Sequence, residues 1–200
     1  LNSFLKIIEA TSSQTFMPIT VGGKIKNLSD IEDRLKVCAD KVAINTQAFE
    51  NKRFLNDAAK EFGSQCIVSS IDVKLINNEH KVFINGGKKN TNLNIEEWLK
   101  EVQDLGAGEI FLNSIDKDGS ATGYDEQLIE KVSKIINVPL IICGGVGSYN
   151  DFEKGLKYEV VDAVAAANFF HYKDQSVYFS KKYLYEKNLN IRKPQTFEIK

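Results

Sequence analysis

Two segments of this chain repeat one pattern, 121 positions apart. Each copy begins with a proline and a short apolar run, continues through a glycine pair and a helix-like stretch, and ends in a second apolar run that starts with Asp. The copies, residues 18–46 and 139–168, each predict a strand, a glycine turn, a helix and a strand, so the fold must hold this βαβ unit twice. The matching pairs are Pro18/Pro139, Gly23/Gly144, Asp30/Asp151, Glu32/Glu153, Leu35/Leu156, Lys36/Lys157 and, after a one-residue insertion, Asp40/Asp162 and Val42/Val164.

The glycine turns of the two copies predict anion binding. Glycines directly after a buried strand let backbone N–H groups approach a phosphate, and the N-terminus of the next helix adds a favourable dipole. Gly23 and Gly144 both hold this position. Two such turns on one barrel would suit a substrate that carries a phosphate at each end.

Strands and helices alternate along the chain without a linker. The expected strands are apolar at nearly every position, which indicates burial on both faces. This leaves two main architectures, the doubly wound sheet and the α/β (β/α)8 TIM barrel. The repeat favours the barrel, because a doubly wound sheet gives no reason for a second glycine turn near its C-terminal end. Strands are expected near residues 19–21, 42–45, 67–72, 109–113, 140–143 and 162–167, and helices near 28–38, 50–62, 94–105, 126–136, 150–157 and 175–187.

Six strands account for only part of a barrel. A complete barrel usually takes about 250 residues, at roughly 30 residues per βα unit, whereas this chain has 200. The shortfall is about two units, and the chain begins at Leu1 in a helix-like segment rather than at Met. We therefore expect residues 1–200 to be a single partial TIM-barrel domain. It would hold the third to eighth βα units, preceded by the end of the second helix.

Composition and charge exclude several classes of protein. The net charge of −1 gives neither the basic surface that nucleic acid requires nor attraction to an anionic membrane. No apolar run approaches the roughly 20 residues that span a bilayer. Cys38, Cys66 and Cys143 form an odd set without CxxC spacing. This favours buried, reduced thiols in a cytoplasmic protein over a metal site.

Polar side chains gather where the predicted strands end, which is the part of a barrel that carries chemistry. Asp72 closes one strand, and Asp116 and Asp118 follow the next one. Between them lies a glycine-rich basic loop, residues 86–91, suited to fold over an anion. Each aspartate alone is compatible with a helix cap or a turn, but together with the two glycine turns they favour a functional site.

The two histidines are expected to have structural roles. His80 lies in a polar stretch that predicts a hairpin tip, and His171 follows the last strand. Neither has a Ser or Cys arrangement that would indicate nucleophilic catalysis.

Several ordered blocks resemble one known family over essentially the whole chain. The sequence is similar to the cyclase subunit of imidazole glycerol phosphate synthase, a (β/α)8 enzyme of histidine biosynthesis, and the similarity begins at that family's second helix. The matching blocks are Thr20-Val-Gly-Gly, Ala39-Asp-Lys-Val-Ala-Ile-Asn-Thr46, Phe62-Gly-Ser-Gln-Cys-Ile-Val, Ser70-Ile-Asp-Val-Lys74, Gly86-Gly-Lys-Lys-Asn-Thr91, Gly106-Ala-Gly-Glu109, Ser114-Ile-Asp-Lys-Asp-Gly119 and Gly123-Tyr-Asp125.

The resemblance implies an ammonia-dependent lyase that works as a heterodimer. Ammonia from a glutaminase subunit would travel through the barrel and attack a ribulosyl aminoimidazole carboxamide nucleotide with a phosphate at each end. The products would be imidazole glycerol phosphate and aminoimidazole carboxamide ribotide. The family pattern includes neither a metal nor a cofactor.

The resemblance also implies roles for individual residues. Asp72 matches one of two acid–base aspartates, and the other belongs to a first strand with no counterpart here, so these 200 residues alone are expected to be inactive. Lys41 and Glu109 match half of a charged ring that gates ammonia, although a plain salt bridge is also possible. Substrate and phosphate contacts are implied for Gly23, Asn45, Thr46, Asn113, Asp118, Gly144, Gly145, Ala167 and Asn168.

Two residues depart from the family pattern and leave alternatives open. Lys24 stands where a third glycine is usual and would either reach the phosphate or obstruct it. Asn168 replaces a serine, although its amide can still donate. Lys24, Val73-Lys74 and residues 165–172 resemble a branch that delivers ammonia for amidation of a bacterial surface sugar. A non-catalytic glutaminase-binding barrel and a phosphate-sugar isomerase barrel are further alternatives, but the retained aspartates and sequence blocks fit the cyclase better.

Overall fold

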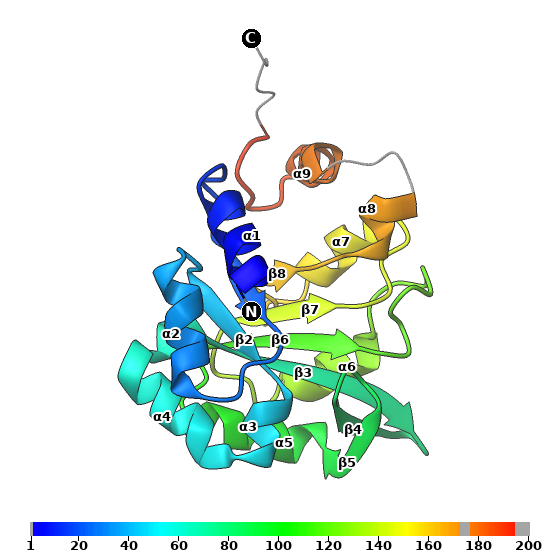
Figure 1. Cartoon of the computed structure of the whole chain (residues 1–200). Coiled ribbons are helices and arrows are strands. Elements are labelled where there is room, and N and C mark those ends of the chain that lie inside the picture. The colour runs from blue at the N-terminus through cyan, green and yellow to red at the C-terminus, as the bar shows by residue number, and fades with distance from the viewer. Residues whose placement is uncertain (1, 173–176, 195–200) are drawn as a thin grey trace.

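The computed structural model describes residues 2–172 and 177–194. Its centre is a curled sheet in which six parallel strands lie side by side in chain order, with helices around them (Figure 1). This arrangement confirms the α/β expectation and matches the curled sheet of a (β/α)8 barrel. β1 and β8 lie at the two ends of the strand order. The six strands are β1 (Thr20–Gly22), β2 (Lys41–Ile44), β3 (Ile67–Ile76), β6 (Glu109–Ser114), β7 (Leu140–Cys143) and β8 (Ala163–Val164).

Most of the helices lie where the sequence predicts them, with small differences at their ends. The helix expected over 50–62 begins at residue 52, and the short helices over 46–50 and 168–172 were not expected. Residues 175 and 176 of the last predicted helix lie outside the described residues. No described helix is long and apolar enough to cross a membrane. The helices are α1 (Asn2–Ser12), α2 (Leu28–Lys36), α3 (Thr46–Glu50), α4 (Lys52–Phe62), α5 (Ile95–Asp104), α6 (Glu126–Val132), α7 (Tyr149–Leu156), α8 (Asn168–Tyr172), α9 (Val177–Glu186) and the short 3₁₀ helix η1 (Ser64–Cys66).

An antiparallel hairpin extends the sheet beyond the six parallel strands. β3 continues past Asp72 and pairs with β4 (Glu79–Ile84), which pairs with β5 (Lys89–Asn94). The turn between β3 and β4 is Asn77-Asn78, with φ of 50° and 63°, the left-handed geometry of a tight two-residue hairpin turn. Residues 86–91, expected as one flexible loop, are thus partly a turn and partly strand β5.

The main core lies between the sheet and the outer helices. A large aliphatic side chain from each of four helices is at most 2% exposed, and burial of each contributes roughly 2 kcal/mol. This layer fixes the helices on the sheet and so holds the strand ends in place. These side chains are Ile31 of α2, Leu55 of α4, Leu99 of α5 and Leu128 of α6, and they join Val42, Ile67 and Ile110 of the strands in one cluster.

Two aspartates of the first repeat copy have the same structural roles as their counterparts in the second copy. Asp30 and Asp151 accept backbone N–H groups in the capping boxes that begin α2 and α7. Asp40 and Asp162 accept the N–H groups of Ile19 and Leu140, over 2.7 Å and 2.9 Å. These carboxylates tie the second strand of each copy to the start of the first. Much of the repeat therefore maintains the βαβ unit rather than a binding site.

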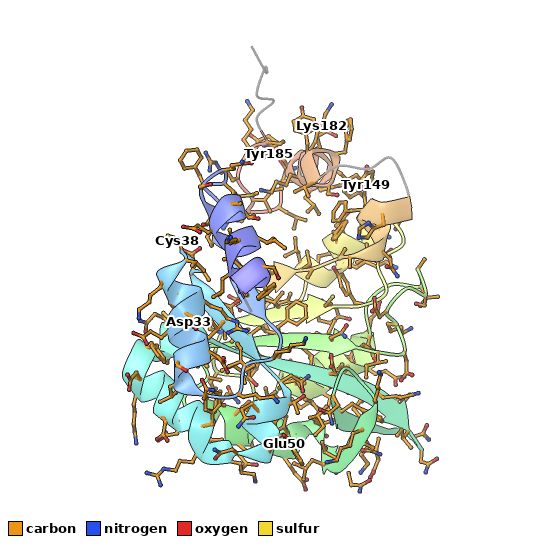
Figure 2. All side chains as sticks on the ribbon, in the orientation of Figure 1. Asp33, Cys38, Glu50, Tyr149, Lys182 and Tyr185 are labelled. Carbon is orange, nitrogen blue, oxygen red and sulfur yellow. The ribbon has the colours of Figure 1, made fainter. Side chains whose placement is uncertain are left out.

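The expectation of buried thiols is wrong for Cys38, which is exposed at the surface beyond the end of α2 (Figure 2). Its φ of 67° places it in the left-handed conformation that commonly ends a helix. The helix end turns this side chain outward despite its apolar surroundings in the sequence. Cys66 and Cys143 are half-buried, and all three cysteines are free thiols.

Candidate active site

The Asp72 carboxylate lies at the centre of the polar strand ends. Asn45 follows β2 and donates its amide to Asp72 Oδ2 over 3.0 Å, while Asn113 of β6 donates to Oδ1 over 3.1 Å. Asn113 is the direct register partner of Asp72, so the parallel pairing of β3 and β6 sets this contact. Two amides thus fix the plane of the carboxylate.

The surroundings of Asp72 shift its ionisation. Burial raises the pKa of this carboxyl group, the two amide hydrogen bonds oppose the rise, and the negative charge of Asp118 adds to it. The net effect is a pKa above the ordinary aspartate value. A carboxyl group with a raised pKa is better suited to exchange protons near neutral pH than an ordinary one.

A cavity of about 590 Å³ lies between Asp72 and the first glycine turn. Gly23 has a φ of 95°, and a Cβ atom built on it would meet nothing within 4 Å. The hairpin closes one side of the cavity, because the Asn85 N–H donates to Thr46 Oγ1 over 3.0 Å. The cavity lining includes the predicted Gly23, Asn45, Thr46 and Asp72, together with Lys24, Lys26, Gln47, Glu50, Ser70, Asn85 and Gly86.

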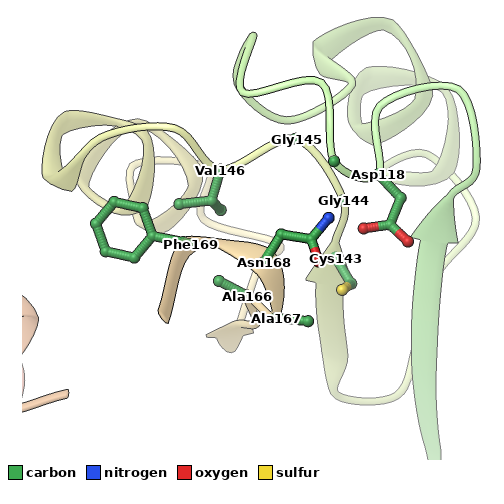
Figure 3. A pocket seen from close by; sticks show the side chains of 10 residues that line it. Asp118, Cys143, Gly144, Gly145, Val146, Ala166, Ala167, Asn168 and Phe169 are labelled. Carbon is green, nitrogen blue, oxygen red and sulfur yellow. The ribbon is translucent and has the colours of Figure 1, made fainter. Parts of the chain in front are cut away.

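The second glycine turn is packed far more tightly. Its cavity has a volume of only about 10 Å³. A Cβ atom on Gly144 would lie 2.6 Å from the Ser114 carbonyl oxygen, and one on Gly145 would lie 2.1 Å from the Gly123 carbonyl oxygen. The first contact comes from the last residue of β6 and the second from the loop that follows this strand. The lining includes the predicted Asp118, Gly144, Gly145, Ala167 and Asn168, with Gly119, Cys143, Val146, Ala166 and Phe169 (Figure 3).

The side chains of Asp118, Cys143 and Asn168 meet beside the Gly144 backbone (Figure 3). Burial raises the pKa of the Cys143 thiol, and the nearby Asp118 charge raises it further. Asp116, two residues before Asp118, instead accepts the Leu75 N–H over 2.7 Å. The two carboxylates of this loop therefore differ, with Asp118 at the cavity and Asp116 holding the hairpin strand.

Lys41 and Glu109 form an ion pair at the other end of the strands. Lys41 begins β2 and Glu109 begins β6, and β3 runs between these two strands. Asp72 and Asn113, by contrast, lie near the carboxyl ends of β3 and β6. The structure thus brings the two predicted gate residues together and separates them from both cavities by the length of a strand.

His80 is not at the hairpin tip, so this expectation is wrong. The tip is Asn77-Asn78, and His80 is a β4 residue that is 3% exposed, with its Nε2 atom 3.4 Å from Asp125 Oδ2. Asp125 also accepts the Ser114 hydroxyl and the Leu128 N–H, each over 3.0 Å. Burial by itself would raise the pKa of Asp125, but these donors and His80 hold it below the ordinary value.

Several residues of the first cavity were not identified from the sequence. Ser70 precedes Asp72 by two positions on β3 and therefore faces the same side of the strand, a period-two signal that the sequence does contain. Asn85 reaches the cavity only because the hairpin folds over it, which no local pattern reveals, whereas Gly86 belongs to the glycine-rich loop that was expected to fold over an anion. Among the described residues, no three His, Cys, Asp or Glu side chains gather as a metal site would require.

Known proteins are similar in sequence to this chain over nearly its whole length. Residues 2–176 match the family described as histidine biosynthesis protein. The chain is 43% identical over 192 residues to the imidazole glycerol phosphate synthase subunit HisF of Hydrogenobaculum sp. (strain Y04AAS1), covering 96% of this chain and 76% of that protein. It is 46% identical over 191 residues to the subunit of the same name from Dictyoglomus thermophilum, covering 95% and 75%. The chain therefore belongs to the HisF family of histidine biosynthesis proteins.

Proposed function

We propose that this protein is the cyclase subunit of imidazole glycerol phosphate synthase. The substrate would be the ribulosyl aminoimidazole carboxamide nucleotide with two phosphates, and the products imidazole glycerol phosphate and aminoimidazole carboxamide ribotide. The observation that carries this proposal is the position of Asp72. Its carboxylate is held by two amides, at the edge of the sheet where the two glycine turns also lie. The name and the extent of the HisF relatives support the same function.

Each part of the substrate has a counterpart at this edge. The backbone around Gly23, with Thr46, would bind one phosphate in the larger cavity. The Gly144–Gly145 backbone and the Asn168 amide would bind the other. Between them, Asp72 would transfer protons during attack by ammonia and ring closure. Its raised pKa makes both the protonated and the ionised form of this carboxyl group accessible. Asp118 would contact the centre of the substrate from the loop after β6.

The opposite end of the strands suits the supply of ammonia. We assign the Lys41–Glu109 ion pair to the entrance through which ammonia from a glutaminase subunit would pass. Separation of this pair would open the entrance, and its re-formation would close it. The protein would then work as a cytoplasmic heterodimer with that glutaminase, without a metal or another cofactor.

The direct test is ammonia-dependent turnover by the full-length protein. We expect Asp72→Asn to lower kcat by about 10²–10⁴-fold, as for other general acid–base groups, with folding and phosphate binding retained. Asp116→Asn is the matched control, because its carboxylate accepts a backbone N–H away from both cavities, and it should keep kcat within a few-fold. Turnover by Asp72→Asn within a factor of two of the parent would overturn the proposed role. Failure of the parent to form imidazole glycerol phosphate would overturn the proposed function.

A further inference from the structure

Arg34 of α2 is a buried cation directly behind the first glycine turn. Its side chain is 1% exposed, and its Nη2 atom donates to the Gly23 carbonyl oxygen over 2.9 Å. Nη1 donates to the Asp30 carbonyl, and Nε has no hydrogen-bond partner. The centroid of the Phe4 ring lies 5.8 Å from the guanidinium carbon Cζ of Arg34. The partners of Arg34 are thus neutral carbonyl groups and an aromatic ring.

No carboxylate of the described residues forms an ion pair with Arg34. Arginine keeps its charge at any physiological pH. An ionised group taken out of water without a counter-charge is costly, and buried charges are therefore normally paired. The position of Arg34 consequently indicates a negative charge that the described residues do not supply.

The backbone of the turn shows where that charge would lie. Arg34 does not line the first cavity, whereas Gly23 and Lys24 do, so the turn separates the guanidinium group from the cavity. The Gly23–Lys24 peptide bond is trans, which makes its C=O and N–H point in opposite directions. Because the carbonyl points at Arg34, the Lys24 N–H points away from Arg34. An anion in the cavity would accept a hydrogen bond from this N–H, and the buried charge of Arg34 would attract it from behind the turn.

We propose that Arg34 is a positioning residue for phosphate at the first glycine turn. It orients the Gly23–Lys24 peptide toward the anion, and the bound phosphate is the counter-ion of its buried charge. This inference rests on the proposed function, which assigns a substrate phosphate to this turn. The second turn has no such cation behind it, because the repeat places Gly155 at the position of Arg34. A Cβ atom there would lie 2.8 Å from the Tyr124 ring, so an aromatic side chain fills that space.

The test is a titration of the ¹⁵N-labelled full-length protein with inorganic phosphate, followed by NMR. The amides of Gly23 and Lys24 report the first turn, and those of Gly144 and Gly145 report the second. We expect Arg34→Met to weaken phosphate binding at the first turn about 10-fold or more, because the buried charge behind the turn and its hydrogen bond to the Gly23 carbonyl are both lost. The response of Gly144 and Gly145 should stay unchanged, which makes the second turn an internal control.

A second variant and a stability measurement separate positioning from folding. Arg34→Gln keeps a donor for the Gly23 carbonyl but removes the charge, and we expect it to weaken phosphate binding at the first turn as well. Without phosphate, Arg34→Met should unfold at a Tm no lower than the parent, because an unpaired buried charge has been removed. The increase of Tm on phosphate addition should become smaller.

Equal phosphate affinity at Gly23 and Lys24 in the parent and in either variant would overturn the role of Arg34 and leave the phosphate site intact. A fall in Tm without any change in affinity would assign Arg34 to folding alone. If the parent itself shows no response at Gly23 and Lys24, the phosphate site of the proposed function fails together with this inference.

Discussion

The two glycine turns share one sequence pattern but differ in what surrounds them. The first faces a cavity of about 590 Å³, and a Cβ atom on Gly23 would meet nothing within 4 Å. The second encloses about 10 Å³, and a Cβ atom on Gly144 would lie 2.6 Å from the Ser114 carbonyl oxygen. In the first turn glycine is needed for backbone conformation, and in the second also for close packing. A repeated motif therefore identifies repeated backbone geometry, not repeated energetics.

The cause of the difference lies in the neighbouring loops. The segment between β6 and α6 packs over the second turn, where the Gly123 N–H donates to the Gly145 carbonyl over 2.8 Å. The first turn has the hairpin at its side and Arg34 behind it. We infer that the first turn can accept an anion as it stands. The second must open, or hold the anion at its mouth.

The largest expected effect is on the stability of the second turn. Gly144→Ala combines a φ of 98° with the clash against Ser114, and we expect it to lower the free energy of unfolding by about 2–5 kcal/mol. Gly23→Ala, the matched variant in the open turn, meets only the backbone penalty of about 1–2 kcal/mol. Urea unfolding of both full-length variants measures the contrast. Equal losses would show that the two turns do not differ in packing as described.

The next effect concerns the loop that packs over the second turn. Asp125 anchors it through Ser114 and the Leu128 N–H, and its pKa is lowered in the folded protein. A lowered carboxyl pKa contributes stability above the unfolded value of about 3.9, and this contribution is lost as the pH falls through the folded pKa. Asp125→Asn keeps a capping oxygen but removes the charge, so it should lose about 1 kcal/mol at pH 7 and progressively less as the pH falls below about 3.9.

Unfolding of Asp125→Asn and the parent across this pH range gives the comparison. Amide shifts at Gly144 and Gly145 should change in the variant, and those at Gly23 should not. A stability difference that does not depend on pH would exclude a role for the Asp125 charge.

The smallest effect is expected at Lys24 in the first turn. Its φ of 53° is a left-handed conformation that disfavours a side chain, so Lys24→Gly should raise the free energy of unfolding by about 0.5–1 kcal/mol. Lys24 also lines the first cavity. We expect its removal to weaken phosphate binding a few-fold through the loss of one cation. Tighter phosphate binding by the glycine variant would show instead that Lys24 obstructs the turn.

The parallel strands and the two turns could be predicted because their signals are local. Apolar runs, the glycine pairs and the polar residue at each strand end lie next to one another in the sequence. Asp72 was identified in this way. The Lys41–Glu109 pair was identified only through the family resemblance. The curled sheet of a barrel, rather than a doubly wound sheet, was inferred from the second glycine turn near the C-terminal end.

The residues that were missed depend on contacts between distant segments. Asn77-Asn78 carried a turn signal, but the position of the hairpin over the first cavity follows from the extension of β3 past Asp72. His80 looked exposed because its sequence neighbours are polar, whereas Asp125, 45 positions later, makes its burial tolerable. Arg34 lies in a helix rich in charged residues, and no pattern distinguishes a buried guanidinium group from a solvated one. Such roles emerge only from packing.

The central claim is that the two turns bind the two phosphates of one substrate on either side of Asp72. The most direct measurement is a crystal structure of the full-length protein saturated with inorganic phosphate. The account predicts two anions at the same edge of the sheet, one at the Lys24 N–H and one at the Gly144–Gly145 backbone, with the Asp72 carboxylate between them. Anions bound elsewhere, or at one turn only, would contradict it.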